Sequence, residues 1–466
     1  MQAKAKYNMV FLWRICLVAA LGGLLFGYDW VVIGGAKPFL IKFFGLENSE
    51  VLVGWAMSSA LVGCLIGSVI SGVSSDRFGR RRLLILSGLL FVVSAIGTGL
   101  ANTFSVFVIY RLLGGIGIGL ASNLSPMYIA EVSPAEMRGK FVSINQLTIV
   151  IGVVAAQVVN WLIAMNMPKN FTEEQILASW YGQTGWRWMF AAETVPAAFF
   201  FFMMFFVPES PRWLVKNAKD KIAGAILDRI GGQEYAKAEV ADIKNTLSNE
   251  IRQVNFKDLL EPKLIRIVSI GVLLAALQQW CGINVIFYYA EEVFKAAGYE
   301  ISGLMLNIVW TGLIMLVFTF IAIFSVDRIG RRALMLIGCA GLTIIYAILG
   351  GCYYFHIKGI HMFILVLAAI SFYSFTLAPI TWVLLSEIFP NRIRGAAMSI
   401  SVFTLWATCW VLAQVFPIMN KKLGAHGSFW TFGVICFLGF IYVLKVLPET
   451  KNKTLEDIER ELVDHL

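Results

Sequence analysis

The sequence has few charged residues and few of the side chains on which catalysis usually depends. Only 14% of its 466 residues are charged, whereas soluble domains carry about a quarter. Its four histidines include no pair at metal-ligand spacing, and we find no nucleophile–base arrangement and no phosphate-binding loop. We therefore expect a protein that is not an enzyme and that holds no metal and no cofactor.

Cysteine is also scarce, and its spacing fits no cross-linked framework. The seven cysteines lie in or beside apolar runs and match neither a disulfide pattern nor a metal-ligand pattern. We interpret them as small core residues.

Apolar sequence is abundant, at 58% of the chain. Runs of about 20 residues, long enough to cross a bilayer, recur from end to end, and no cleavable signal pattern precedes them. The sequence predicts an all-α membrane protein with twelve transmembrane helices. Their approximate ranges are 10–36, 52–75, 83–102, 104–129, 140–166, 188–207, 263–294, 303–325, 333–354, 360–386, 395–420 and 428–447.

The loops between these runs alternate between rich and poor in basic residues. The rich loops hold Arg77, Arg80, Arg81, Arg82, Arg138, Lys140, Arg328, Arg331, Arg332, Arg392 and Arg394, whereas the other set, which includes Lys37 and Lys42, holds little. By the positive-inside rule the rich loops are cytoplasmic, which places both termini inside. This pattern explains the net charge of +9, so we expect no nucleic-acid partner.

The chain repeats itself. SDRFGRRRLL (75–84) matches VDRIGRRALM (326–335), AEVSPAEMRG (130–139) matches SEIFPNRIRG (386–395), and PESPRWL (208–214) is echoed by PETKNKTLED (448–457). Three matches in one order indicate a duplicated six-helix unit, and such repeats bind substrate between the halves near the middle of the membrane. We predict an N-terminal half over 1–207, a linker over 208–262, a C-terminal half over 263–447 and a cytoplasmic tail over 448–466.

The linker is polar and predicted to be helical and cytoplasmic. Val240, Ile243, Leu247, Ile251 and Val254 recur every three or four residues, which is typical of one amphipathic helix face. Gly231-Gly232 separates this helix from an earlier one.

These motifs, with RLLGGIGIG in the fourth span, resemble the sugar porter family of the major facilitator superfamily over essentially the whole chain. The likeness is strongest to the bacterial xylose–proton symporters. It implies the major facilitator fold and transport of a monosaccharide.

Asp29, in the stretch GYDWVVIGG, is a carboxylate inside an apolar run, where a charge costs about 2.5–3.5 kcal/mol. It is either satisfied by local backbone donors or carries protons. Arg111 is its natural cation, unless that side chain reaches to the membrane interface instead. The resemblance implies that Asp29 and Arg111 are the proton-coupling pair, because facilitative relatives carry a neutral residue at the position of Asp29.

A second cluster of polar residues is QQWCGINVIFYYA (278–290). Gln278, Gln279 and Asn284 point in different directions on an ideal helix, so we expect a break at Gly282 that turns them inward. They either bond helices together or bind sugar hydroxyls. The resemblance implies the second role, and implies sugar contacts for a wider set: Phe26, Gln146, Gln278, Gln279, Asn284, Tyr288, Trp382 and Trp406.

Four positions depart from the pattern of the xylose symporters. Val153 and Leu405 replace amides, Met315 stands where relatives often have Asn, and Ala378 replaces Gly. Losing amides that bond hydroxyls can change specificity strongly. A less hydroxylated sugar, a deoxysugar or a polyol is therefore possible, and xylose is not assumed.

Acids accompany the arginines of the basic loops in both halves, which positive-inside charge does not explain. The resemblance implies a cytoplasmic latch, strongest in the outward-facing state, made of Asp76, Arg80, Arg81, Glu131 and Arg138 in one half and Asp327, Arg331, Arg332, Glu387 and Arg394 in the other.

The sequence thus predicts proton-coupled symport of a pentose or hexose by alternating access. The expected partners are a monosaccharide, the proton and membrane lipid, for a monomer in the plasma membrane, which in a bacterium is the inner membrane. A facilitative sugar or polyol uniporter and a non-transporting sugar sensor remain alternatives, although the short tail disfavours the sensor.

Overall fold

A computed structural model describes residues 7–168, 171–249, 262–296, 301–389 and 393–451. Within these ranges the chain is helical and has no strand, which confirms the predicted all-α class. The helices before the linker are α1 (Met9–Phe43), α2 (Glu50–Phe78), α3 (Arg80–Leu100), α4 (Phe104–Val132), α5 (Arg138–Ala164), α6 (Glu173–Ala178), α7 (Trp186–Ala191) and α8 (Thr194–Met203), with the short turns η1 (Ala135–Met137), η2 (Tyr181–Gly185) and η3 (Met204–Phe206).

The linker contributes α9 (Pro211–Lys216) and α10 (Asp220–Asn249). The remaining helices are α11 (Pro262–Trp280), α12 (Ile283–Tyr288), α13 (Ala290–Ala296), α14 (Ile301–Ile329), α15 (Arg331–Tyr354), α16 (Ile360–Phe375), α17 (Leu377–Glu387) and α18 (Arg394–Val446).

Eleven helical stretches among the described residues are long and apolar enough to cross a membrane. The last, Ala396–Val446, has 51 residues and as one straight helix would be about 75 Å long, against a hydrocarbon core of about 30 Å. Gly424, with φ 68° and ψ 176°, interrupts it, so it supplies two crossings. The first helix continues past Pro38 to Phe43 instead of ending near residue 36.

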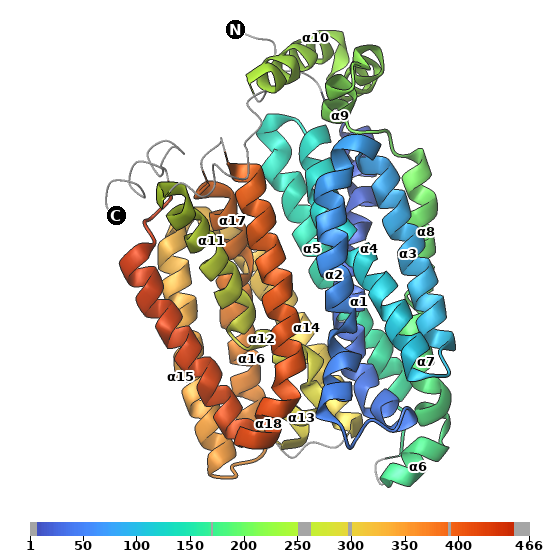
Figure 1. Ribbon diagram of the computed structural model, residues 1–466, viewed down its shortest axis with the longest axis vertical. Coiled ribbons are helices and arrows are strands. Elements are labelled where there is room, and N and C mark those ends of the chain that lie inside the picture. Colours follow the sequence, from blue (N-terminus) through green and yellow to red (C-terminus); the bar gives the residue numbers. More distant parts are fainter. Residues whose placement is uncertain (1–6, 169–170, 250–261, 297–300, 390–392, 452–466) are drawn as a thin grey trace.

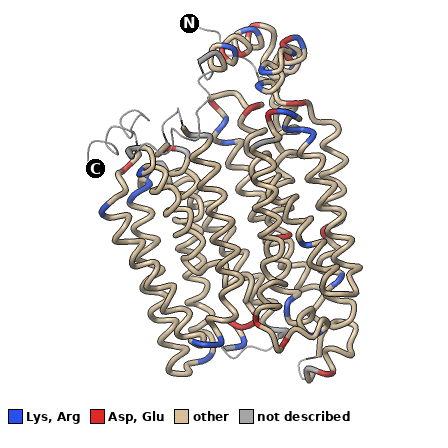
Figure 2. Tube along the Cα trace, viewed as in Figure 1, with Lys and Arg blue, Asp and Glu red and all other residues tan. Residues whose placement is uncertain are grey.

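The helices form two groups that stand side by side (Figure 1). Helices α1–α8 make up one half and α11–α18 the other, and the halves meet chiefly where α2 packs on α18 and α5 on α14. Helix α10 lies at one end of the bundle, which we call the linker end; the opposite end is the far end. Charged residues gather at these two ends, and few lie between them (Figure 2).

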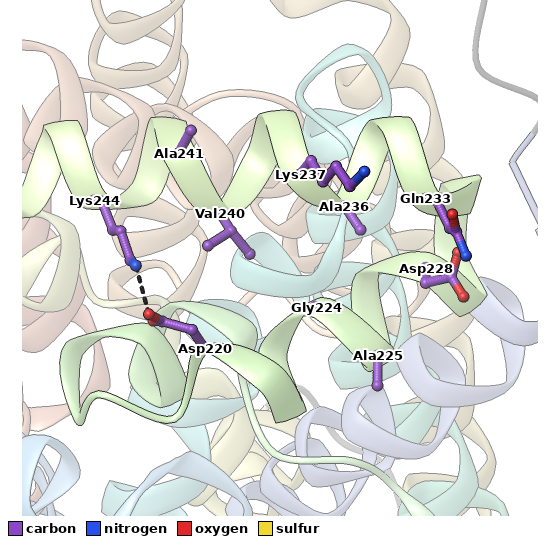
Figure 3. A pocket seen from close by; sticks show the side chains of 10 residues that line it. All are labelled: Asp220, Gly224, Ala225, Asp228, Gln233, Ala236, Lys237, Val240, Ala241 and Lys244. Carbon is purple, nitrogen blue, oxygen red and sulfur yellow. Dashed lines mark hydrogen bonds and ion pairs between the residues drawn. The ribbon is translucent and has the colours of Figure 1, made fainter.

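Helix α10 is divided at Gly232, whose φ of 85° and ψ of 172° are not helical, as the Gly231-Gly232 pair predicted. Its two parts lie side by side, and an ion pair between Lys244 and Asp220 joins them (Figure 3). Val240, Ile243 and Leu247 are half-buried, whereas Ile251 and Val254 lie outside the described residues. An open groove of about 490 Å³ between the two parts has small side chains such as Ala225 and Ala236 on its walls.

Glycines set how closely α2 and α4 approach. A Cβ placed on Gly115 would overlap the carbonyl oxygen of Ala60 and lie 2.9 Å from the Cα of Gly63. Small residues of this kind let membrane helices pack backbone against backbone.

We expect Gly115→Val to destabilise the N-terminal half by about 1–3 kcal/mol, because the larger side chain would force the two helices apart. Thermal unfolding in detergent should show a lower melting temperature than the native protein. Gly72→Ala is the control, because a Cβ at Gly72 meets nothing within 4 Å. Equal melting temperatures for the native protein and Gly115→Val would contradict this account of the packing.

Candidate functional site

Asp29 of α1 and Arg111 of α4 form an ion pair in the interior of the N-terminal half. Arg111 donates from Nη1 to Asp29 Oδ1 and, at 3.4 Å, from Nη2 to the backbone oxygen of the same residue. Both residues are almost inaccessible, at 0% and 2% exposed. The guanidinium also lies over the ring of Phe190, 5.3 Å from its centre. Arg111 therefore does not reach to the interface, and Asp29 is not satisfied by local backbone donors alone.

The second carboxylate oxygen of Asp29, Oδ2, takes no part in the hydrogen bonds with Arg111 described above. Oδ2 is buried and finds no hydrogen-bond partner among the described residues. Gly114 makes room for it, because a Cβ there would lie 3.0 Å from Oδ2 and would also overlap the hydroxyl of Ser94. The geometry leaves one oxygen of this buried carboxylate able to accept a proton while the other holds the arginine.

Glu193, between α7 and α8, is a second buried acid beside this pair, and our sequence analysis missed it. It is 3% exposed, its Oε1 has no partner among the described residues, and it interacts electrostatically with both Asp29 and Arg111. The signal was available, because Glu193 is a lone carboxylate inside the predicted span 188–207, just as Asp29 is in the first span.

Aromatic side chains from both halves surround the same place. Phe26 of α1 packs on Trp406 of α18 with ring centres 5.6 Å apart, and Trp30 lies 6.2 Å from Tyr288. A small cavity, with room for about one water molecule, is bounded by these rings and by the ion pair. Its lining comprises Phe26, Asp29, Trp30, Met57, Ala60, Leu61, Cys64, Arg111, Ile118, Tyr288 and Trp406.

The indole N–H of Trp406 is an unmet donor in this region. Its Nε1 is buried without a partner among the described residues, and Trp406 as a whole is only 3% exposed. A buried donor without an acceptor costs about 1–3 kcal/mol, so a hydroxyl oxygen brought here would be stabilised.

The amides of the C-terminal half are joined by a break in the helix. Gly282, with φ 86°, separates α11 from α12, as predicted. Gln278 donates to the carbonyl of Ala378 at 3.1 Å, Gln279 donates to Gln278 at 3.4 Å, and Asn284 donates to Gln279. The two sets of amides, which an ideal helix would point apart, thus form one connected chain.

The remaining candidate contacts lie on neighbouring helices. Gln146 on α5 and Trp382 on α17 are half-buried, and neither borders the small cavity. Val153, Met315, Ala378 and Leu405 are all buried, at 0%, 4%, 8% and 3% exposed.

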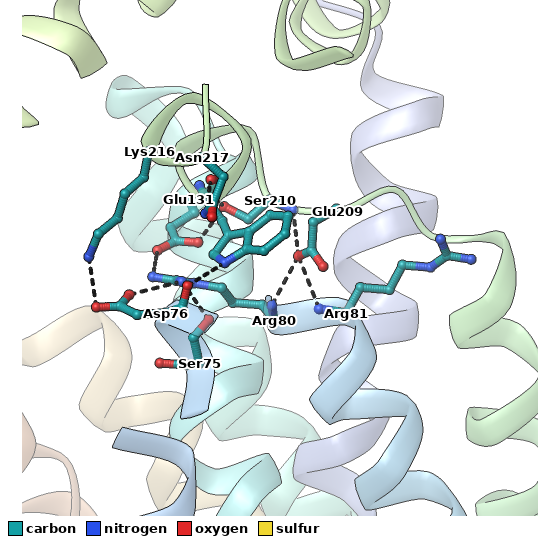
Figure 4. Close-up of polar contacts among 10 residues, drawn as sticks. Ser75, Asp76, Arg80, Arg81, Glu131, Glu209, Ser210, Lys216 and Asn217 are labelled. Atoms are coloured by element: carbon teal, nitrogen blue, oxygen red, sulfur yellow. Dashed lines mark hydrogen bonds and ion pairs between the residues drawn. The ribbon is translucent and has the colours of Figure 1, made fainter. Parts of the chain in front are cut away.

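At the linker end of the N-terminal half, charged residues tie four helices together (Figure 4). Arg80 donates to Asp76 at 3.3 Å and to Glu131 at 2.9 Å, and Lys216 of α9 donates to Asp76 at 2.7 Å. Burial alone would raise the pKa of Asp76, but the hydrogen bond and charge of Lys216, with the charge of Arg80, hold that pKa below its usual value. Arg80, Asp76 and Glu131 come together as the sequence suggested.

Glu209, which we did not single out, completes this network. Its carboxylate accepts from the backbone N–H groups of Arg80 and Arg81 at 3.0 and 3.1 Å, at the N-terminus of α3, where helix dipoles favour a negative charge. Gly79 has φ 88°, and a Cβ there would overlap that carboxylate. This contact explains why the sequences DRFGRR and PES occur together.

The C-terminal half repeats the arrangement. Arg331 donates to Glu387 at 3.0 Å, and Glu449 accepts from the backbone N–H groups of Arg331 and Arg332 at 2.9 and 3.1 Å. Gly330 has φ 103°, and a Cβ there would lie 2.7 Å from Glu449 Oε2. The side chains of Asp327 and Arg394 lie outside the described residues.

Three predicted latch arginines bind carbonyl oxygens in the contacts that the structure describes. Arg138 donates to Ala130 at 3.1 Å, Arg81 to Met204 at 3.3 Å, and Arg332 to Leu444 at 2.7 Å. The described ion pairs at the linker end do not bridge the two halves. Each lies within one half or joins the N-terminal half to α9 of the linker.

The far end differs, because there the ion pairs do bridge the halves. Lys37 of α1 pairs with Glu291, at 3.4 Å, and with Glu292, both on α13, and Lys421 of α18 pairs with Glu50 of α2. We had placed Lys37 in a loop, which is wrong: it lies within α1 and is 5% exposed. Ser58 also donates to Gln414 at 2.9 Å. The halves are thus joined at the far end.

Comparison with known proteins agrees with this geometry. Residues 15–462 match the family described as "Sugar (and other) transporter". The chain is 40% identical to the arabinose-proton symporter of Bacillus subtilis (strain 168), over 98% of this chain and 96% of that one. It is also 40% identical to the D-xylose-proton symporter of Escherichia coli (strain K12), over 97% and 96% of the two chains.

A solved structure of the Escherichia coli xylose transporter, in a partially occluded inward open conformation, superposes with a TM-score of 0.84. It shares 38% sequence identity, and the match covers 96% of this chain and 100% of that one. The many apolar helices of the present chain show that it is an integral membrane protein. The resemblance read from the motifs is confirmed: the chain belongs to the sugar transporter family and has the fold of the major facilitator superfamily.

Proposed function

We propose that this protein couples the uptake of a monosaccharide to the entry of protons, by alternating access. The observation that carries the proposal is the buried Asp29–Arg111 pair. Its second carboxylate oxygen has no partner in the part of the chain that the structure describes, and both residues border the same cavity as Phe26, Tyr288 and Trp406. The proposed proton site thus lies beside three of the residues that we propose contact the sugar. The two relatives named above are both sugar–proton symporters.

Asp29 accepts the proton on Oδ2, and the cavity has room for about one water molecule to deliver it. Protonation removes the counter-ion of Arg111, and an unpaired buried charge is costly. Glu193 lies close enough to interact with the guanidinium electrostatically. The charge state of this cluster can thus change how α1 and α4 pack, and α1 carries two of the aromatic rings that touch the other half.

The sugar binds between the halves. Gln278, Gln279 and Asn284 offer donors and acceptors to its hydroxyls, and the indole N–H of Trp406 offers a further donor. Aromatic faces such as those of Phe26 and Trp406 pack against the C–H patches of a sugar ring. The amides are bonded to one another in the structure, so the sugar takes the place of contacts that they now make among themselves.

Alternating access follows from the unequal contacts at the two ends. Ion pairs bridge the halves at the far end, while at the linker end the described pairs stay within each half. We take the linker end to be cytoplasmic, which places both termini inside a bacterial inner membrane and makes this conformation inward-facing. In the outward-facing state the two linker-end networks would approach each other and act as the inner latch of a monomer.

Asp29→Asn is expected to abolish proton movement and retain sugar exchange, because the amide keeps the shape and cannot carry a proton. Purified protein in proteoliposomes should be given a panel of pentoses, hexoses, deoxysugars and polyols while external pH is recorded. One sugar should alkalinise the outside with the native protein and fail to do so with Asp29→Asn.

Arg14→Gln is the matched control, since Arg14 is the other charged residue of the first apolar run and is exposed; it should behave as the native protein does. Sugar entry without proton movement in every form would refute symport and leave a uniporter. Sugar binding without transport would instead identify a sensor.

Lys37→Met is expected to open the far end. Removing one partner of a buried ion pair costs about 3–5 kcal/mol. Glu292 would lose its described lysine partner, and Glu291 would keep only Lys295. Spin labels at the exposed positions 51 and 423, one in each half, should show a new population at longer distance. Lys421→Met is the comparison, because this lysine is exposed and surface pairs contribute under about 1 kcal/mol. Identical distance distributions in both variants would contradict the role given to Lys37.

A further inference from the structure

Two glutamines form hydrogen bonds from one half of the bundle to the other. Gln157 of α5 donates from Nε2 to the hydroxyl of Thr311 on α14 at 3.2 Å. Gln414 of α18 accepts from the hydroxyl of Ser58 on α2 at 2.9 Å and donates to the backbone oxygen of Val51 at 3.1 Å. These are the two helix pairs through which the halves chiefly meet. We call the two contacts the α5–α14 bridge and the α2–α18 bridge.

A glycine lies against each of these glutamines. A Cβ on Gly312 would overlap Gln157 Oε1, and a Cβ on Gly54 would lie 2.8 Å from Gln414 Nε2. Each bridge therefore combines a glutamine of one half with a hydroxyl and a glycine of the other. The glycine lets the amide approach the backbone of the opposite helix closely.

The two bridges are related by the internal repeat. Gln414 follows Gln157 by 257 residues and Thr311 follows Ser58 by 253, and the duplicated loop motifs recur after 251 and 256 residues. The same groups thus occur at nearly equivalent positions of both halves, and the same kind of bridge forms at both helix pairs.

Both bridges lie toward the far end of the bundle. Gln157 is near the end of α5, which leads to α6, and Thr311 is near the start of α14, which follows α13; α6 and α13 lie at the far end (Figure 1). Ser58 is near the start of α2, where Glu50 forms its far-end ion pair. Opening of the far end would therefore separate the partners of both bridges.

Closure of the far end buries these polar groups. Gln157 and Thr311 are 1% and 2% exposed, and Ser58 is 0% exposed. Gln157 Oε1 finds no hydrogen-bond partner in the part of the chain that the structure describes. A buried amide is costly once its partner is removed, whereas water bonds the same amide when the far end is open. The closed end thus depends on hydrogen bonds that opening would replace with water.

We propose that the two glutamine bridges determine the equilibrium between the inward-facing and the outward-facing state. Each bridge stabilises the closed far end only while both of its partners are present, so loss of one partner shifts the equilibrium toward the outward-facing state. This inference rests on the proposed function, because it requires the halves to alternate between these two states.

The test removes one partner of a bridge and then both. Thr311→Val leaves Gln157 Nε2 without its acceptor, and Ser58→Ala leaves Gln414 Oε1 without its donor. Each change should favour the open far end roughly 5- to 100-fold, the effect of leaving a buried polar group unpaired. Gln157→Met combined with Thr311→Val should return the equilibrium to its native position or further toward closure, because replacing both partners by apolar groups is nearly neutral or stabilising.

Spin labels on the full chain in proteoliposomes report both ends of the bundle. One pair replaces Glu47 and Leu423, which are exposed at the far end in opposite halves. The other pair replaces Arg82 and Ile329, which are exposed at the linker end in opposite halves. In each single variant the far-end distance should lengthen while the linker-end distance shortens, a reciprocal change that local unfolding would not produce.

Thr343→Val is the matched control, because the hydroxyl of Thr343 donates at 2.7 Å to Cys339 of its own helix; its distances should equal the native ones. Native distances in either folded single variant would overturn the proposal, as would a double variant that stays as open as Thr311→Val. If Thr311→Val does not fold, Ser58→Ala decides the matter by itself.

Failure of the proposed function would look different. In that case the two distances would not change in opposite directions in any form of the protein, with or without the sugars of the panel, and alternating access itself would be refuted.

Discussion

The ion pair between Asp29 and Arg111 is the constraint around which the N-terminal half is arranged. Two charges buried in a membrane protein are tolerated only if they pair with each other. The pairing requires α1 and α4 to pack with Asp29 and Arg111 at the same level of the bundle. Gly114 provides the space for the free carboxylate oxygen, and Phe190 covers the guanidinium. The aromatic side chains of α1 are carried by the same helix, so they reach the other half from a position that the ion pair fixes.

The duplicated loops serve the bundle in a different way. In each half a glycine with positive φ, Gly79 or Gly330, lets a distant carboxylate reach the first N–H groups of the next helix. Glu209 and Glu449 are those carboxylates, and each also brings the chain that follows the half back to its linker end. Each half is thereby closed on itself, so that it can move as one body when the contacts between the halves change.

The residues proposed to contact the sugar come from both halves. The amides of α11 and α12 converge because the helix breaks at Gly282, and Phe26 of α1 packs on Trp406 of α18 across the boundary between the halves. Under the proposed function, a sugar would contact both halves at once. Such a ligand would favour the arrangement of the halves in which both sets of contacts are made.

Much of this molecule could be predicted from sequence because lipid imposes simple local rules. Twelve helices in two halves were predicted from the length of each apolar run, the charge of each loop and the repeated motifs. The break at Gly282 was predicted from helix geometry, and a candidate proton site from the energy needed to place the carboxylate of Asp29 in an apolar run. These are properties of segments or single residues, and they depend on solvation and helix geometry alone.

The tertiary structure decided which residues meet. Lys37 reaches across 254 positions to Glu291, and Glu193, between α7 and α8, lies near the pair of Asp29 and Arg111. The sequence alone does not specify these contacts in space, because they depend on how the helices rotate and shift against one another until their side chains pack. The sequence by itself therefore determined the transmembrane helices and the buried carboxylate of Asp29, because these depend on local solvation. Only the packing of the helices decided which end of the bundle is closed, because that depends on contacts between distant residues.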